Sequence, residues 1–299
     1  MILHDLSAVH GAGLGLRRAL MSSFALSDKA PVDFLELAPE NWIRMGGKSR
    51  RELSAIAEKY PIVAHGLSLS IGAPHLLDFD FLAELKLFLN RYSIGIYSEH
   101  LSYCGDHGHL YDLMPIPFTD DSVKYVAARL RQVQDFLGRK IAIENVSYYC
   151  APGQEMDEIT FLNSILEEAD CFLLLDVNNI YVNSINHQYD ALEFIRKIPT
   201  DRIVYIHIAG HANEAENLII DSHGADVINP VWDLLRYTYQ FHGVYPTLLE
   251  RDFNLPPFDV LLKEVEKIKM IQGMVNRDAS SSVLKSKKNS ADYNLAVGG

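Results

Sequence analysis

Short apolar runs alternate with segments of helical periodicity along most of the chain, and this alternation restricts the fold more than any other feature. The helical spacing of apolar residues is clearest in the segments 53–60 and 123–137. An alternation that lasts from about residue 32 to about residue 272 indicates βα units built on a parallel sheet. Eight runs have the composition of buried strands, at 34–37, 62–65, 94–97, 141–144, 172–176, 203–208, 218–221 and 247–250.

The number and character of these runs predict an α/β fold, a closed (β/α)8 TIM barrel, rather than an open doubly wound sheet. Gly11, Gly13 and Gly15 stand before the first predicted strand, so no glycine-rich dinucleotide motif follows a strand. The segment 209–217 is too short for a full crossover helix, so we expect an irregular connection there. We predict one barrel domain over 1–275 and a polar, flexible tail over 276–299.

Charge and cysteine content narrow the classes of function. The chain of 299 residues has 27 basic and 39 acidic side chains, a net charge of -12 that disfavours nucleic acid as a partner. The chain contains no run of about 18 consecutive apolar residues, the length that a membrane-spanning helix needs. Three cysteines without a C-x-x-C pair suit a reducing compartment, and the first residues lack a secretory pattern, so we expect a cytoplasmic protein.

Acidic and histidine side chains stand at the end of every predicted strand. The active site of a TIM barrel lies at the carboxyl ends of its strands, so these side chains are expected to converge. Any one of them alone would more often be structural, but carboxylates gathered at one mouth repel one another unless cations are present. The residues are Glu36, His65, Glu99, His100, Glu144, Asp176, His207, Asp221, His223, Glu250 and Asp252.

The donor types predict a centre of several metal ions. Imidazoles and carboxylates without thiolates suit zinc, manganese or iron, and the number of donors exceeds the needs of one ion. Asp221 and His223 would share one face of a regular strand, whereas His211 is interpreted as a residue of the mouth. Glu36, Glu99, Asn145 and Asn179 are left open as supporting residues. The predicted metal ligands are His65, His100, Glu144, Asp176, His207, Asp221, His223 and Glu250.

Several motifs, spread over nearly the whole chain and in a consistent order, resemble those of the multinuclear non-heme iron-dependent oxidative enzymes. This family includes the oxidase of methanobactin biosynthesis. The motifs are GAGLGLR at 11–17, FLELAPEN at 34–41, SEHL at 98–101, IENV at 143–146, LDVNN at 175–179, HIAGH at 207–211, DSH at 221–223 and LERD at 249–252.

The resemblance implies a barrel similar to xylose isomerase, two or three iron ions per chain, and dioxygen as co-substrate. It implies oxidation of cysteine residues in a ribosomally synthesised precursor peptide, with a separate small protein that recognises the peptide's leader. By position, the eight predicted ligands match the family's metal-binding motifs, and Asn145, Asn179 and His211 match positions near the metal cluster. We expect Glu144, Asp176 and His211 to take part in catalysis.

Two other classes of function remain open. A divalent-metal sugar isomerase or epimerase, or an endonuclease-like hydrolase, can use similar ligands on the same barrel, although the net charge disfavours the nuclease. A metal-storing scaffold or partner-binding module is the third possibility. The identity of the bound metal distinguishes an isomerase or hydrolase from an iron oxidase. Dioxygen uptake with a peptide distinguishes an oxidase from a metal-storing scaffold or binding module.

Overall fold

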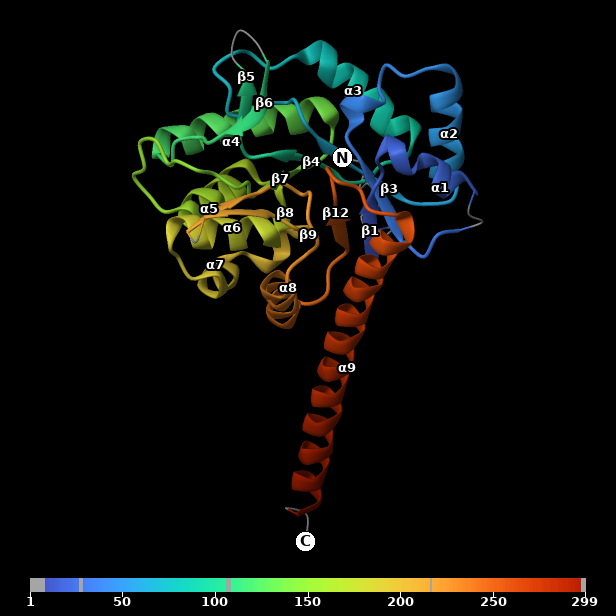
Figure 1. Ribbon diagram of the computed structural model, residues 1–299. Coiled ribbons are helices and arrows are strands. Elements are labelled where there is room, and N and C mark those ends of the chain that lie inside the picture. The colour runs from blue at the N-terminus through green and yellow to red at the C-terminus, as the bar shows by residue number, and fades with distance from the viewer. Residues whose placement is uncertain (1–8, 27–28, 106–108, 216, 297–299) are drawn as a thin grey trace.

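The computed structural model describes residues 9–26, 29–105, 109–215 and 217–296, and its centre is a closed barrel of parallel strands (Figure 1). Closure occurs where β1 pairs with both β12 and β2, in register Ala12 with Thr247 and Gly13 with Phe34. The predicted barrel is therefore confirmed. In spatial order the strands are β1 (Ala12–Gly15), β12 (Thr247–Glu250), β9 (Ile203–Ala209), β8 (Phe172–Asp176), β7 (Ala142–Glu144), β4 (Tyr97–His100), β3 (Ile62–Gly66) and β2 (Phe34–Leu37).

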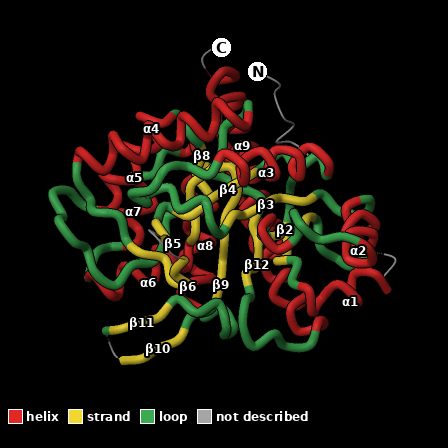
Figure 2. Tube along the Cα trace, turned by 90° about the horizontal axis from the view of Figure 1, so that it is seen from above, coloured by secondary structure: helices red, strands yellow, loops and turns green. Residues whose placement is uncertain are grey.

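Helices surround the barrel (Figure 2). Side-chain oxygens of Asp78, Thr119 and Asp157 cap the amino ends of α3, α4 and α5 by accepting backbone N–H groups. Each helix turns an apolar face toward the strands, which forms the main core outside the barrel wall. The helices are α1 (Met21–Leu26), α2 (Gly47–Ala57), α3 (Phe79–Arg91), α4 (Asp120–Leu137), α5 (Glu158–Ala169), α6 (Val177–His187), α7 (Ala191–Lys197), α8 (Asn229–His242) and α9 (Phe258–Ala296), with 3-10 turns at Arg18–Leu20, Pro39–Asn41 and Thr200–Arg202.

One predicted barrel strand was wrong and one was missed. The run at 218–221 contributes β11 (Leu218–Ile220), which pairs antiparallel with β10 (Ala212–Ala215) outside the barrel. The first barrel strand is instead β1, in the glycine-rich segment that we placed before the strands. The strand was missed because its inward positions are glycines, which are uncommon inside strands. Glycine is needed at position 13, because a Cβ there would lie 2.6 Å from the ring of Phe34. In addition, β4 begins at Tyr97, later than the predicted run at 94–97.

The inside of the barrel consists of an apolar layer with a polar layer directly above it. Side chains two residues apart on a strand share a face, so each apolar residue is followed by a polar one on the same strand. The apolar layer is Phe34, Val63, Ile96, Ala142, Leu174, Tyr205 and Leu248. The polar layer, two residues later in each case, is Glu36, His65, Ser98, Glu144, Asp176, His207 and Glu250, all buried. The candidate site therefore lies on a packed floor.

Two antiparallel hairpins follow the carboxyl ends of barrel strands. One joins β5 (Tyr103–Gly105) and β6 (His109–Met114) after β4, and the other joins β10 and β11 after β9. Figure 2 shows the second hairpin projecting beyond the helices. The irregular connection expected over 209–217 thus includes a strand, β10.

Helix α9 packs on the barrel at its start and then extends away from it (Figure 1). Leu261, Val265 and Ile268 are fully buried, and the helix continues to Ala296, so the backbone of 276–296 is helical. The division at residue 275 and the flexibility of the tail stay predictions. Among the described residues, no helix combines the length and apolarity needed to cross a membrane.

Candidate metal centre

The mouth of the barrel holds three groups of candidate ligands that are linked by shared carboxylates. Within each group, one ligand atom from every residue lies within 4.8 Å of the others. Glu144 belongs to the first two groups and Glu250 to the last two. The groups are His65, His100 and Glu144, then Glu144, Asp176, His207 and Glu250, then His223, Glu250 and Asp252.

In the first group, two imidazole nitrogens and one carboxylate oxygen converge. His65 Nε2 lies 3.1 Å from His100 Nε2, and Glu144 Oε2 lies 3.1 Å from the former and 3.4 Å from the latter. The Nδ1–H of His100 donates to the carbonyl oxygen of Gly66 at 3.0 Å, so the neutral ring presents a lone pair at Nε2. Burial, and then the neighbouring His65, lower the pKa of His100 to about 4. Two imidazole nitrogens and one carboxylate oxygen at these distances can bind one metal ion.

The second group surrounds His207 at the centre of the polar layer. Its Nε2 lies 2.8 Å from Glu36 Oε2, which leaves Nδ1 facing Glu250 Oε2 at 3.0 Å and Glu144 Oε1 at 3.6 Å. Asp176 Oδ2 lies 3.9 Å from the same nitrogen. All of these side chains are buried. Three carboxylates around one imidazole nitrogen is the donor set of a hard or borderline divalent cation.

The third group lies nearer the surface and depends on a loop. Asp221 and His223 follow β11 rather than ending a barrel strand, so the predicted strand geometry is wrong for this pair. They still meet, with Asp221 Oδ1 2.7 Å from His223 Nε2, in a turn where His223 has a φ of 48°. Asp221 itself is in none of the three groups. A histidine in this left-handed region is uncommon and is often found at functional sites. His223 Nδ1 lies 3.5 Å from both Glu250 Oε2 and Asp252 Oδ2.

Sequence reasoning named Asp252 as a strand-end acid but did not place it among the ligands. The signal was available, because Asp252 stands two residues after Glu250, the same spacing that favoured Asp221 and His223. Arg17, from the segment after β1, was also missed. Its guanidinium donates to Asp252 and, at 3.3 Å, to Glu250 Oε1. This arginine offsets part of the negative charge of the third group.

Unpartnered buried atoms provide the test of whether these residues fit metal ions. Buried polar atoms without a hydrogen bond are costly and rare in folded proteins. Six such atoms, counted among the described residues, belong to the predicted site; some lie close to another candidate ligand, but none makes a hydrogen bond. They are Glu144 Oε2, Asp176 Oδ2, His207 Nδ1, His211 Nε2, His223 Nε2 and Glu250 Oε2. Five of the six belong to the three groups, so the residues fit divalent cations.

The family described as "RiPP precursor modification enzyme MbnB/TglH/ChrH" matches residues 11–273 of the chain, which include every strand of the barrel and every group of ligands. The protein belongs to this family. The resemblance seen in the sequence is thereby confirmed. The three groups of candidate ligands lie in a member of an enzyme family that modifies precursor peptides.

Similar proteins include several called UPF0276 protein. The one from Shewanella sediminis is 56% identical over 88% of this chain and 95% of its own length, and the one from Shewanella loihica is 59% identical over 86% and 92%. Among solved structures, the 3-keto-D-glucoside 4-epimerase YcjR of E. coli has a TM-score of 0.58 at 14% identity, covering 87% of this chain and 99% of that chain. A xylose isomerase domain protein from Alicyclobacillus acidocaldarius has a TM-score of 0.54 at 16% identity, covering 88% and 99%. These structures confirm the xylose isomerase-like barrel.

His211 lies beside the three groups in this family member without being part of one. Its Nδ1–H donates to Asn178 Oδ1 at 2.8 Å, and Asn178 Nδ2 donates to Asp221 Oδ1 at 2.9 Å. The ring stacks on Tyr181 with centroids 5.3 Å apart. Its Nε2 has no hydrogen-bond partner among the described residues, and burial lowers the pKa of the ring. His211 thus presents a neutral, proton-accepting nitrogen.

The four residues left open by the sequence divide into two kinds. Glu36 supports His207 from below, and the Asn145 side chain exchanges two hydrogen bonds of 2.9 Å with the backbone of Asp176. Asn179 donates from Nδ2 to the carbonyl oxygen of Asn145 at 3.0 Å. Glu99 instead shares the outer face of β4 with Tyr97, whose hydroxyl it accepts at 2.6 Å. Glu99 therefore lies on the other side of the barrel wall from the centre.

The three groups predict that metal affinity rises with pH. Burial opposes the charge on His65, but the Glu144 carboxylate outweighs burial and raises its pKa to about 9. A metal ion at Nε2 must displace this proton, so zinc affinity should increase by up to about tenfold per pH unit as pH approaches 9. Competition with a chelator at pH 6.5, 7.5 and 8.5 measures the slope, and an affinity independent of pH would contradict the assignment of His65.

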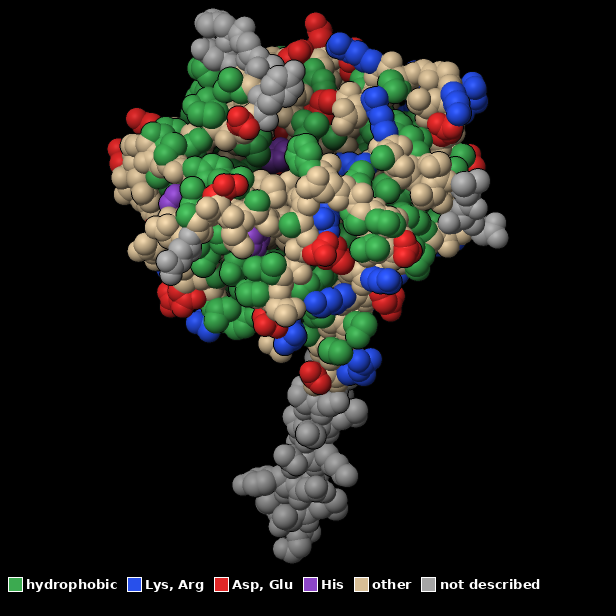
Figure 3. Space-filling view, in the orientation of Figure 1, with side chains coloured by type: hydrophobic (Ala, Val, Ile, Leu, Met, Phe, Trp, Pro, Cys, Tyr) green, Lys and Arg blue, Asp and Glu red, His purple; other side chains and the backbone are tan. Residues whose placement is uncertain are grey.

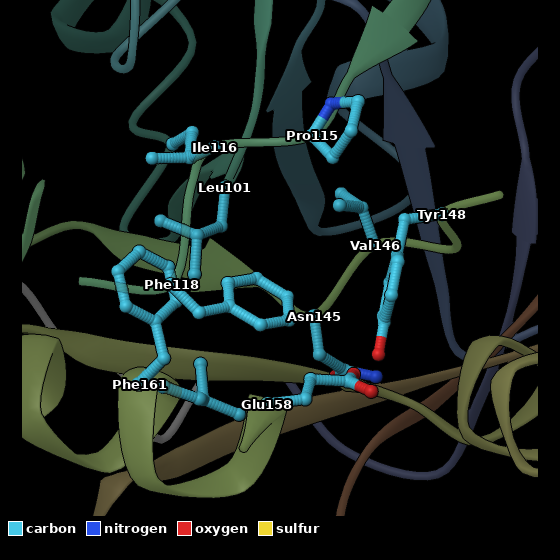
Figure 4. Close-up of a pocket in the computed structure, with 10 residues that line it drawn as sticks. Leu101, Pro115, Ile116, Phe118, Asn145, Val146, Tyr148, Glu158 and Phe161 are labelled. Atoms are coloured by element: carbon cyan, nitrogen blue, oxygen red, sulfur yellow. The ribbon is translucent and has the colours of Figure 1, made fainter. Parts of the chain in front are cut away.

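Glu158, at the start of α5, is a further buried carboxyl group, and Figure 4 shows it beside Asn145. It borders a cavity of about 20 Å³, room for a single water molecule, together with Asn145, Tyr148 and apolar side chains. Asn183 Nδ2 donates to its Oε1 at 3.1 Å, while its Oε2 has no hydrogen-bond partner among the described residues. Burial raises the pKa of Glu158 to about 8.

Glu158 is expected to make the stability of the fold pH-dependent. Between pH 4.5 and 8 the folded state keeps a proton that the unfolded state has lost, so the free energy of unfolding falls as pH rises, by at most about 1.4 kcal/mol per unit. Glu158→Gln should flatten this slope and raise stability at pH 8 by roughly 1 to 2 kcal/mol. Urea unfolding at several pH values measures both, with Glu167→Gln on the exposed side of α5 as control. Equal slopes in the two variants would refute the expectation.

Proposed function

We propose that the protein is an iron- and dioxygen-dependent oxidase that modifies cysteine residues of a ribosomally synthesised precursor peptide. The observation that carries the proposal is the chain of three ligand groups joined by Glu144 and Glu250. Shared carboxylates are suited to bridge neighbouring ions, and the family modifies precursor peptides. Two or three iron ions per chain are the cofactor that the family resemblance implies, and the imidazole and carboxylate donors are compatible with them.

Iron, when bound, supplies open coordination positions for a cysteine thiolate and for dioxygen and takes up the electrons of the oxidation. The protein supplies orientation and charge. Carboxylates from β7, β8 and β12 offset the charge of the ions, and the apolar layer beneath them excludes water from below. His100 is fixed by its bond to Gly66 and Asp176 by its bonds to Asn145.

His211 has the geometry of a proton acceptor in this reaction. Its unpartnered Nε2 lies at the mouth, and Asn178 fixes the opposite nitrogen as the one that carries the proton. We propose that it receives a proton from the reacting part of the peptide. Glu144 and Asp176, which we also expect in catalysis, would act through the ions that they hold.

The substrate peptide would be presented by a small leader-recognition protein, as the family resemblance implies. The net charge of -12 favours a peptide whose leader is basic. Nucleic acid and membrane are not part of the proposed function. A cytoplasmic location suits both the free cysteines and a peptide modified before export.

Metal analysis with optical and Mössbauer spectra tests the proposal, on protein purified without chelators or added metal. Two to three irons per chain with a spin-coupled signal, and dioxygen uptake that depends on a cysteine-containing precursor peptide, would support it. Colourless protein with stoichiometric zinc, manganese or magnesium would favour the isomerase, epimerase or hydrolase alternative. Iron without peptide-dependent dioxygen uptake would favour a storage scaffold.

A further inference from the structure

A chain of buried hydrogen bonds crosses the barrel beneath the metal-facing histidines. Glu36 Oε2 accepts the hydroxyl of Tyr205 at 2.8 Å, and Tyr205 Oη lies 2.6 Å from Ser98 Oγ. Ser98 Oγ lies 2.8 Å from Nδ1 of His65. The same Glu36 oxygen lies 2.8 Å from Nε2 of His207. None of these side chains is more than 5% exposed, so water does not compete for their bonds.

The chemistry of the groups fixes the direction of the protons along this chain. A carboxylate only accepts hydrogen bonds, so Tyr205 donates its hydroxyl hydrogen bond to Glu36 and must accept one from Ser98. Ser98 has then used its only proton and must accept the Nδ1–H of His65. The other possible acceptor for Ser98, the carbonyl oxygen of Ala64, is more distant at 3.4 Å. Once the Nε2 proton is lost, the neutral ring of His65 has its lone pair at Nε2, the atom that faces His100 and Glu144.

The second arm from Glu36 has the same effect on His207. Its Nε2–H donates to the carboxylate, which leaves a lone pair at Nδ1, the atom that faces Glu250 and Glu144. The two histidines would thus bind metal through different ring nitrogens, and one carboxylate determines both. Histidine ligands commonly depend on such partners for their tautomer.

We propose that Glu36 is a positioning residue that sets the metal-binding tautomers of two histidines, directly for His207 and through Tyr205 and Ser98 for His65. The proposal rests on the proposed metal centre and names the residues that control it. Tyr205 and Ser98 carry no charge and contact no candidate ion, so their effect on metal binding would have to pass along the chain.

Two variants that each remove one oxygen atom test the His65 arm. Tyr205→Phe and Ser98→Ala are each expected to lower the affinity for one zinc ion by about 10- to 100-fold in a chelator competition. The double variant should bind this ion no less tightly than Ser98→Ala alone. Glu36→Gln should lower the affinity for two zinc ions. Tyr239→Phe is the matched control, because it removes a buried hydroxyl that bonds to Thr247 away from the centre.

The second measurement reports the proton itself. In the zinc-loaded full chain with ¹⁵N-labelled histidine, the Nδ1–H of His65 should give a resonance protected from exchange, which Tyr205→Phe and Ser98→Ala remove and Tyr239→Phe retains. If both variants retain this resonance and bind zinc as tightly as Tyr239→Phe does, the proposed role of the hydrogen-bond chain is wrong. If the variants behave as expected but wild-type protein contains no iron and oxidises no peptide, the proposed function is wrong while the role of Glu36 stands.

Discussion

Replacement of Glu144 by glutamine is expected to remove two metal ions and to abolish peptide oxidation. Glu144 is the carboxylate shared by the first and second groups, with Oε2 near His65 and His100 and Oε1 near His207. Burial opposes its charge, but His65 and His100 outweigh burial and hold its pKa below the usual range, so the side chain is an anion. A neutral amide bridges cations poorly, so metal analysis should find the content reduced by about two ions, and activity should fall by at least about 100-fold.

The comparison with single-group ligands makes this prediction specific. His223→Ala removes a residue of the third group only, so it should cost one ion and leave the other two groups occupied. Glu99→Gln is the matched control, since Glu99 is a buried glutamate on the adjacent strand β4 that faces away from the centre. If Glu144→Gln retains the metal content and activity of Glu99→Gln, the bridging role of Glu144 is wrong.

Replacement of His211 by asparagine is expected to stop turnover without loss of metal. The asparagine amide can still donate to Asn178 Oδ1, so the variant removes the unpartnered Nε2 and keeps the contact that orders the loop. Loss of a general acid or base costs about 10² to 10⁴-fold in rate, so steady-state dioxygen uptake with peptide should fall by that factor. Iron content and the optical spectrum should stay at wild-type values.

The outcome of this experiment separates two roles for His211. His75→Asn, a change of the same kind at an exposed position, provides the control. A loss of iron in His211→Asn would identify His211 as a ligand rather than a proton acceptor. Retention of iron with unchanged activity would remove it from the reaction altogether.

The placement of candidate ligands could be predicted from the sequence where residues obey the two-residue period of a strand. Each of these residues stands within the last three positions of a barrel strand, two residues after an inward apolar residue, so the two-residue period alone places it on the inner face. They are His65, Glu144, Asp176, His207 and Glu250. His100, the last residue of β4, follows the same period after Ser98.

Prediction failed where placement depends on the whole fold. Asp221 and His223 meet through a left-handed turn after a hairpin, which no period describes. Arg17 approaches Glu250 from the opposite end of the chain, because barrel closure brings β1 beside β12. The hydrogen-bond chain from Glu36 was equally hidden, since Ser98 and Tyr205 are ordinary strand residues until three different strands bring them together.

Gly13 on β1 illustrates how a residue without chemistry can determine the chemistry of a site. Its missing side chain makes the space that the ring of Phe34 occupies, and Phe34 lies one inward position below Glu36. A single methyl group at this position would displace the Phe34 ring in the layer directly beneath Glu36, the residue that bonds to His207 and Tyr205. A redesign of the ligands, for another metal or another peptide, therefore has to treat this glycine as part of the centre.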